Sequence, residues 1–178
     1  MRSFPYRFMI RGKASRAERQ RLQRRQSMAE LSIDLSWTYA DAAKFPNRHT
    51  ITFSGAQQVE SDAAPDWGGS ESATNPEQAL GAAMASCHMM TFLALAKKAK
   101  WPVRQYSDHA TAHLGKNPTG QMAVVRIDLA PIVTFDTGFE CTEDMLVTMH
   151  ERAHRYCFIA NSVSDALTVD IQPARAST

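Results

Sequence analysis

Hydrophobic and polar residues alternate with a period of two near the start of the patterned sequence, which predicts β-strands. The alternation runs through SIDLSWTYA (residues 32–40) and HTITF (49–53). Ser54-Gly55 marks a turn into AQQVES (56–61), which we expect to be a third strand. The Gly/Ser/Asp-rich stretch 63–75 then predicts a loop large enough to border an active site.

A long helix is predicted next. Asn75 suits the N-cap, Pro76 the first helical position and Glu77 the first turn, while lysines 97, 98 and 100 suit the C-terminal end and Pro102 stops the helix. Small residues allow another helix to approach closely, so we expect this helix to be central and buried. They are Ala79, Gly81, Ala82, Ala83, Ala85 and Ser86.

The rest of the pattern completes an α+β fold. Two long strands are expected near residues 103–115 and 121–134, on either side of a turn at 115–120, and ALTVDIQ (166–172) predicts a last strand. Apolar residues at helical spacing predict a second helix over 142–156: Met145, Leu146, Met149 and Ala153. The order β-β-β-α-β-β-α-β favours mainly antiparallel pairing.

Charge divides the chain into two parts. Residues 1–27 hold nine Lys/Arg and one acid, whereas the remainder has eleven basic and seventeen acidic residues. We therefore expect a basic, disordered extension over 1–27 and one domain over 28–178, with a transit-like or nucleic-acid-binding arm as the alternative for the extension. Because the body is acidic, we expect no nucleic-acid partner. No stretch approaches the roughly 20 apolar residues of a membrane span, so we expect no membrane partner.

Three cysteines with no CxxC and no secretory signal argue against a disulfide framework and favour a cytoplasmic protein. In that setting a cysteine pair more often carries chemistry. Cys87 lies in the small-residue helix and Cys157 in HERAHRYCFIANSV; taken alone, Cys87 is typical of a small buried residue. Cys141 lies beside Glu140 and Glu143, which predicts a raised pKa and an inert thiol.

Two charged residues are candidates to tune Cys87. Arg48 would lower the pKa of a nearby thiol, or it is a solvated loop cation. Glu77 lies ten residues before Cys87, about 15 Å along a straight helix and on another face. The two share a site only if the helix breaks near Gly81 or if a partner subunit supplies a second copy. Otherwise Glu77 complements the helix dipole.

A metal site remains an alternative. His150, His154 and Cys157 fall at i, i+4 and i+7 on one helix face, and Cys87 with His88 would complete a zinc or iron site. Neither segment has the paired CxxC or HExxH pattern of such sites, so His154 is otherwise a packed or capping residue. The methionines and aromatics around Cys87 line an apolar pocket or belong to the core: Met84, Met89, Met90 and Phe92.

Two motifs, TNPEQALGAAMASCHMM and AHRYC followed by IANSV, resemble the OsmC/Ohr family of organic hydroperoxide reductases, over about residues 32–172. The resemblance implies an OsmC-like fold in which antiparallel sheets wrap around central helices in an intertwined homodimer, with active sites at the interface. It makes Cys87 the peroxidatic and Cys157 the resolving cysteine. Glu77 matches a glutamate that works with an arginine, for which Arg48 is the candidate. Phe158 replaces the proline usual after the second cysteine.

The function implied by this resemblance is that of a cysteine-based peroxidase, an oxidoreductase of the oxidative stress response without a cofactor. Cys87 would reduce an organic peroxide or hydrogen peroxide and become a sulfenic acid. Cys157 would condense with it to a disulfide, and an external dithiol, for which the resemblance suggests the lipoyl type, would restore both thiols. The alternative is a non-catalytic OsmC-like protein that binds a small ligand or a metal.

Overall fold

The computed structural model describes residues 15–16, 29–38, 46–172 and 175–177. The expected boundary between an extension over 1–27 and a domain from residue 28 therefore lies almost wholly outside the described residues, and it stays a prediction.

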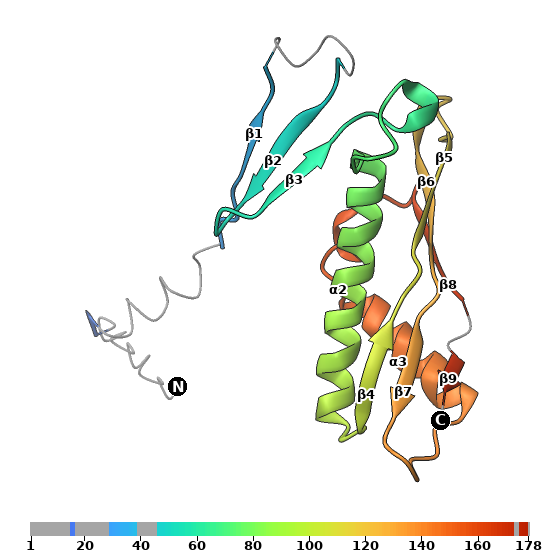
Figure 1. Cartoon of the computed structure of the whole chain (residues 1–178). Helices are drawn as coiled ribbons and strands as arrows, with labels where there is room; N and C mark the ends of the chain where they lie inside the picture. Colours follow the sequence, from blue (N-terminus) through green and yellow to red (C-terminus); the bar gives the residue numbers. More distant parts are fainter. Residues whose placement is uncertain (1–14, 17–28, 39–45, 173–174, 178) are drawn as a thin grey trace, which may run out of the picture.

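The first three strands form a separate antiparallel sheet, as their alternation predicts. They are β1 (Ile33–Ser36), β2 (His49–Phe53) and β3 (Gln58–Ser61), in the order β1-β2-β3. Figure 1 shows this sheet projecting beside the rest of the molecule rather than packing on it. Large apolar side chains are consequently exposed on it: Ile33, Leu35, Trp37, Phe53 and Val59.

Helix α2 (Pro76–Lys98) begins where the sequence predicts. The Asn75 side chain accepts from the Gln78 main-chain N–H at 2.8 Å, and the Gln78 side chain accepts in return from the Asn75 N–H at 3.3 Å, which is a capping box. One face is buried, through Gly81, Met84, His88, Phe92 and Ala96. The opposite face is not buried within one chain, contrary to our expectation, and exposes Ala79, Ala82, Ala83, Ser86, Met90 and Ala94.

By length and composition α2 also meets the requirement for crossing a membrane, which our reading of the sequence missed. That evidence is weak, because core helices of water-soluble proteins meet the same requirement.

The two long strands predicted after α2 are each divided in two. They form β4 (Val103–Ser107), β5 (Thr111–Lys116), β6 (Met122–Leu129) and β7 (Ile132–Phe135). Pro131 has no N–H for a ladder, and the Asp108 carboxylate accepts from the Ala130 N–H at 2.8 Å in place of a strand partner. β4 and β7 therefore pair in one sheet and β5 and β6 in another.

The second helix, α3 (Glu143–Tyr156), is capped by Thr142 and is followed by a short 3₁₀ turn, η3 (Ala160–Ser162). Strand β8 (Thr168–Ile171) adds in parallel to β6, and β9 (Arg175–Ser177), which the sequence did not predict, adds in parallel to β7. The connection through α3 supplies the crossover that parallel pairing needs.

The core consists of two clusters along α2. One packs Phe92 and Ala96 against α3 and β7, and the other packs Met84 and Cys157 against β6. The clusters hold the helices to the strands, which lie side by side in Figure 1.

Two adjacent glycines in the loop before α2 should differ in how well they tolerate a side chain. A Cβ on Gly69 would lie 1.6 Å from the Ala63 carbonyl oxygen, whereas one on Gly68 meets nothing within 4 Å and faces only the strain of its φ of +82°. We expect Gly69→Ala to destabilise the fold by several kcal/mol and Gly68→Ala by about 1 kcal/mol, measured by urea denaturation. Equal losses for the two variants would contradict this account of the loop.

Candidate functional site

The two cysteines singled out from the sequence meet in the structure. Cys87 lies midway along α2, and Cys157 is the C-cap residue of α3, which runs antiparallel to α2. Both belong to the same apolar cluster, in which Cys157 is fully buried and Cys87 is partly exposed. The two thiols influence each other's ionisation: Cys157 lowers the pKa of Cys87, and Cys87 raises that of Cys157. Two cysteines that are 70 positions apart in the sequence thus lie in one cluster.

The surroundings of Cys87 favour its thiolate. Burial opposes ionisation, but hydrogen bonds from the Ile159 N–H, the Cys157 thiol, the Phe158 N–H and the Thr91 hydroxyl outweigh it, so that the pKa of Cys87 is lowered. None of these groups is a cation. The stabilisation comes from dipoles at the end of α3.

Cys157 is affected in the opposite direction. Burial raises its pKa, and the hydrogen bond and charge of Cys87 raise it further, against the opposing N–H groups of Ala160 and Ile159. Of the two thiols, Cys87 therefore loses its proton more readily than Cys157. Burial also raises the pKa of Cys141. The direction matches our prediction for Cys141, but the cause is desolvation rather than the neighbouring acids.

The charged candidates lie elsewhere in the chain. α2 is continuous from Pro76 to Lys98, so the suggested break near Gly81 does not occur. Glu77 therefore stays about 15 Å from Cys87 along the helix axis. Arg48 donates to the Ser72 hydroxyl at 3.1 Å, in the loop before α2. Within one chain the structure brings neither residue to the thiols.

A cavity of about 470 Å³ opens at the N-terminal end of α2. Its walls are mostly apolar, and Glu77 and His49 are among the polar groups that reach it. The Glu77 Oε2 atom is buried and has no hydrogen-bond partner among the described residues. The apolar wall comprises Ala63, Ala64, Trp67, Pro76, Leu114, Met122, Ala123 and Val124. The size is that of a small-molecule site.

Next to the thiols, two buried imidazoles join α2 to α3. His88 Nε2 lies 2.9 Å from His150 Nδ1, and the ring planes differ by 7°. With ring centroids 5.3 Å apart, the rings meet edge to edge, so the hydrogen bond lies in both planes. Sequence reasoning considered both histidines only as metal ligands. The available signal was their spacing from the cysteines: His88 directly follows Cys87, and His150 lies two turns before Cys157 on α3.

Burial lowers the pKa of both imidazoles to about 4, and each is lowered further by a neighbouring histidine, His154 for His88 and His88 for His150. Both rings are therefore neutral at pH 7, and one donates to the other. Among the residues that the structure describes, no group of three His, Cys, Asp or Glu side chains is arranged to hold a metal ion.

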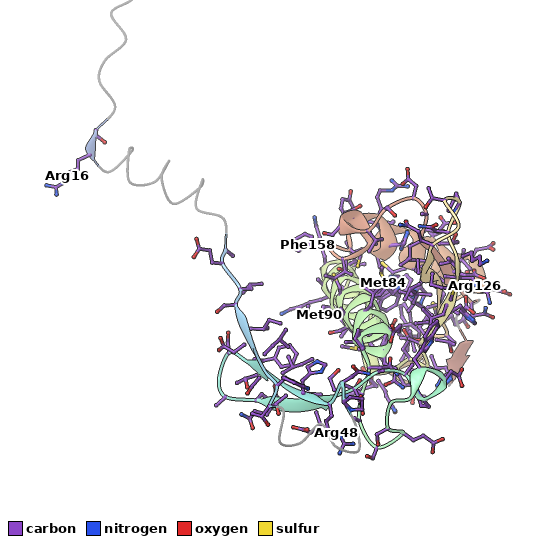
Figure 2. All side chains as sticks on the ribbon, turned by 90° about the horizontal axis from the view of Figure 1, so that it is seen from above. Arg16, Arg48, Met84, Met90, Arg126 and Phe158 are labelled. Carbon is purple, nitrogen blue, oxygen red and sulfur yellow. The ribbon has the colours of Figure 1, made fainter. Side chains whose placement is uncertain are left out.

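The apolar residues around Cys87 divide between core and surface. Met84 and Phe92 are fully buried, whereas Met90 is 60% and Phe158 81% exposed. Figure 2 shows Met90 and Phe158 on the same side of the molecule, opposite Arg126. The dithiol therefore borders an exposed apolar surface.

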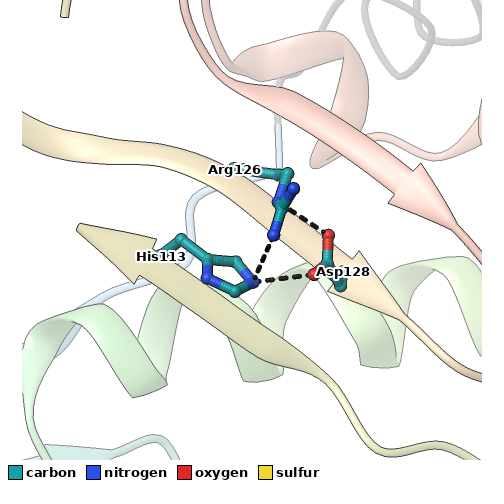
Figure 3. Close-up of polar contacts among 3 residues, drawn as sticks. All are labelled: His113, Arg126 and Asp128. Carbon is teal, nitrogen blue, oxygen red and sulfur yellow. Dashed lines mark hydrogen bonds and ion pairs between the residues drawn. The ribbon is translucent and has the colours of Figure 1, made fainter. Parts of the chain in front are cut away.

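A second polar cluster lies on the other face of β6 (Figure 3). Asp128 Oδ1 forms an ion pair with Arg126 Nε at 3.0 Å, and Asp128 Oδ2 lies 2.7 Å from His113 Nε2. Strand side chains alternate between faces, so these residues point away from Ile127 and Leu129, which pack with Cys157. The cluster is a partly exposed ion-pair group on the face of β6 away from the thiol site.

Comparison with known proteins identifies the architecture. Residues 68–172 match the family model described as OsmC-like protein. An OsmC-like protein of unknown function from Vibrio cholerae is 35% identical, with a TM-score of 0.74, 82% of this chain covered and 100% of that chain. No curated protein matches the sequence.

Two more distant structures share the fold. An organic hydroperoxide resistance protein from Elizabethkingia anophelis has 14% identity and a TM-score of 0.69, covering 85% of this chain and 99% of its own. One from Legionella pneumophila has 16% identity and a TM-score of 0.65, covering 85% and 100%. At these identities the likeness concerns the fold alone.

The histidine pair predicts an acid-sensitive fold. Between pH 6.5 and about 4 the two histidines are protonated in the unfolded chain but stay neutral in the folded protein. The free energy of unfolding is therefore highest above pH 6.5 and decreases as the pH falls from 6.5 to about 4. We expect a loss on the order of a few kcal/mol at pH 4 relative to His88→Gln/His150→Asn, which keeps polar groups at both nitrogens without titration. Thermal denaturation across pH 4–8 measures the difference.

Burial raises the pKa of Asp108, so this residue stabilises the folded protein at low pH, opposite to the histidines. Because the wild type and the double variant both contain Asp108, its effect cancels when their stabilities are compared. Parallel pH curves for the two proteins would refute the assignment to the imidazoles.

Proposed function

The chain belongs to the OsmC-like protein family, and from this premise we propose that it is a thiol-dependent peroxidase acting through Cys87 and Cys157. The observation that carries the proposal is that the two cysteines lie in one apolar cluster, where the pKa of Cys87 is lowered and that of Cys157 is raised. A merely structural pair has no need of opposite pKa shifts. A cytoplasmic location, where thiols stay reduced, accords with the three free cysteines.

The chemistry proceeds in balanced steps. The Cys87 thiolate attacks the distal oxygen of a hydroperoxide; the S–O bond forms as the O–O bond breaks, and the alkoxide takes a proton from solvent. Cys157 then attacks the Cys87 sulfenic acid, and the hydroxyl group leaves as water with the Cys157 proton. An external dithiol reduces the resulting disulfide by exchange. The exposed Met90 and Phe158 beside the thiols favour an organic peroxide.

Glu77 and Arg48 join the site only if two chains share it. The uncovered face of α2 carries small residues centred on Ala82 and Ala83, where a second helix can approach closely. Glu77 and Cys87 lie five residues to either side of Ala82. Two α2 helices packed antiparallel across a two-fold axis at that point would bring the partner subunit's Glu77 to Cys87.

The β1–β3 sheet supports the same arrangement. It exposes Leu35, Trp37 and other large apolar side chains that one chain leaves uncovered, as a sheet that packs on a partner would. Arg48 immediately precedes β2. If the β1–β3 sheet packs on the partner subunit, Arg48 would be positioned with it at the shared site. The proposed functional unit is therefore a homodimer with two composite sites.

Thiol titration tests the proposed activity. One equivalent of cumene hydroperoxide is expected to remove two of the three thiols of the reduced protein rapidly, because oxidation of Cys87 is followed by closure onto Cys157. Cys87→Ser should abolish the loss, and Cys141→Ser should still lose two thiols. If the wild-type protein kept all three thiols after this treatment, the proposed peroxidase activity would be refuted.

Complementation tests the composite site. Homodimers of Cys87→Ser and of Glu77→Gln should both be impaired, whereas a purified heterodimer of the two variants should regain one intact site, and with it about half of the wild-type rate. Sites contained within single chains would give no recovery. Differently tagged, co-expressed chains allow the heterodimer to be isolated.

A ligand-binding role without catalysis is the second candidate, because the cavity beside Glu77 has the volume of a small-molecule site. Under that role, peroxide would leave the thiols untouched, so the same titration separates the two functions.

A further inference from the structure

The hydrogen bond between His88 and His150 is a directional contact across the interface between α2 and α3. His88 Nε2 lies 2.9 Å from His150 Nδ1, and the two ring planes differ by only 7°. Both side chains are buried. Phe92 stacks on the His150 ring with the centroids 4.4 Å apart, so this ring is also held from a second side.

The imidazole pair is tied to the cysteines along both helices. His88 directly follows Cys87, and His150 precedes Cys157 by seven residues, about 10 Å along the helix axis. α3 is continuous from Glu143 to Tyr156, and Cys157 is its C-cap residue. A displacement of His150 along α2 would therefore move Cys157 by a similar distance relative to Cys87.

The hydrogen bond restricts such a displacement more tightly than apolar packing does. Hydrogen bonds weaken beyond about 3.2 Å, whereas apolar atoms stay in contact out to about 4.5 Å. A disulfide requires its two Cβ atoms to lie about 3.5–4.5 Å apart. A slip of α3 by about 1 Å would thus break the imidazole contact and preserve many apolar ones, yet it spans the whole range that a disulfide tolerates.

We propose that His88 and His150 are positioning residues for the dithiol. Their hydrogen bond holds α3 on α2 in the register in which Cys87 and Cys157 can form a disulfide. The inference rests on the proposed function, since it concerns the step in which Cys157 resolves oxidised Cys87. It gives a reason for two polar rings in an apolar interface, where His88 Nδ1 and His150 Nε2 are buried without partners in the described structure.

Two double variants separate the hydrogen bond from the packing. Burial lowers the pKa of both imidazoles to about 4, so His88→Gln/His150→Asn exchanges one neutral hydrogen-bonding pair for another at pH 7. His88→Leu/His150→Phe removes the hydrogen bond together with the unpartnered nitrogens, and Phe at position 150 keeps a ring against Phe92. Because no polar atom of the pair stays buried, we expect the reduced form of this second variant to resist urea at least as well as the wild type.

The equilibrium with oxidised glutathione measures the effect on the cysteines. One glutathione disulfide accepts two electrons from Cys87 and Cys157, which gives the protein disulfide and two glutathione thiols. We expect the equilibrium constant to fall roughly fivefold in His88→Leu/His150→Phe, the effect of one hydrogen bond, and to stay within about twofold of wild type in His88→Gln/His150→Asn. Mass spectrometry identifies the linked cysteines. An unchanged constant in the first variant, or an equal fall in both, would overturn the proposal.

The wild type supplies a measurement that does not depend on the folding of a variant. Coupling between two equilibria is reciprocal, so the disulfide should protect the hydrogen bond by the same factor. The imidazole N–H of the pair should exchange with solvent roughly fivefold more slowly in the oxidised than in the reduced protein, relative to main-chain amides of β6, which report overall stability. Equal relative rates would refute the positioning role. Neither measurement uses peroxide, so a failure of the proposed activity is told apart from a failure of this inference.

Discussion

The site depends on the antiparallel packing of α2 against α3. This packing places residues in layers: Cys87 meets Cys157, His88 meets His150, and farther along Phe92 stacks on His150. Apolar contacts supply most of the attraction between the helices, but they constrain distance and orientation loosely. The imidazole pair adds a directional contact in the middle of the interface, next to the layer that contains the sulfurs.

Polar burial in this interface has a cost. His88 Nδ1 and His150 Nε2 are buried without partners in the described structure, and aromatic residues of similar shape would fill the space without that penalty. Departures of this kind from optimal packing concentrate near functional sites. Their position beside the dithiol fits that tendency, and the low pKa of the imidazoles keeps positive charge away from the core.

Much of the fold followed from local rules. Asn75-Pro76-Glu77 located the start of α2, and the alternation in HTITF gave β2 with its observed bounds. The breaks in the long strands were missed because they depend on Pro131 and on the Asp108 carboxylate reaching across to Ala130. Among the site residues, the two cysteines could be paired through a family resemblance. The contact between His88 and His150 could not, since only the packing of α2 on α3 brings two histidines 62 positions apart within hydrogen-bond distance.

The backbone around Cys87 is held more rigidly than the backbone around Cys157. Cys87 is embedded in an unbroken helix of 23 residues, while Cys157 occupies an end where regular hydrogen bonding stops. Any shortening of the gap between them must therefore be absorbed on the Cys157 side, by the short segment that also carries the solvent-facing ring of Phe158. Formation of a disulfide would thus move the exposed ring of Phe158, so that the surface of the protein would differ between its oxidised and reduced states.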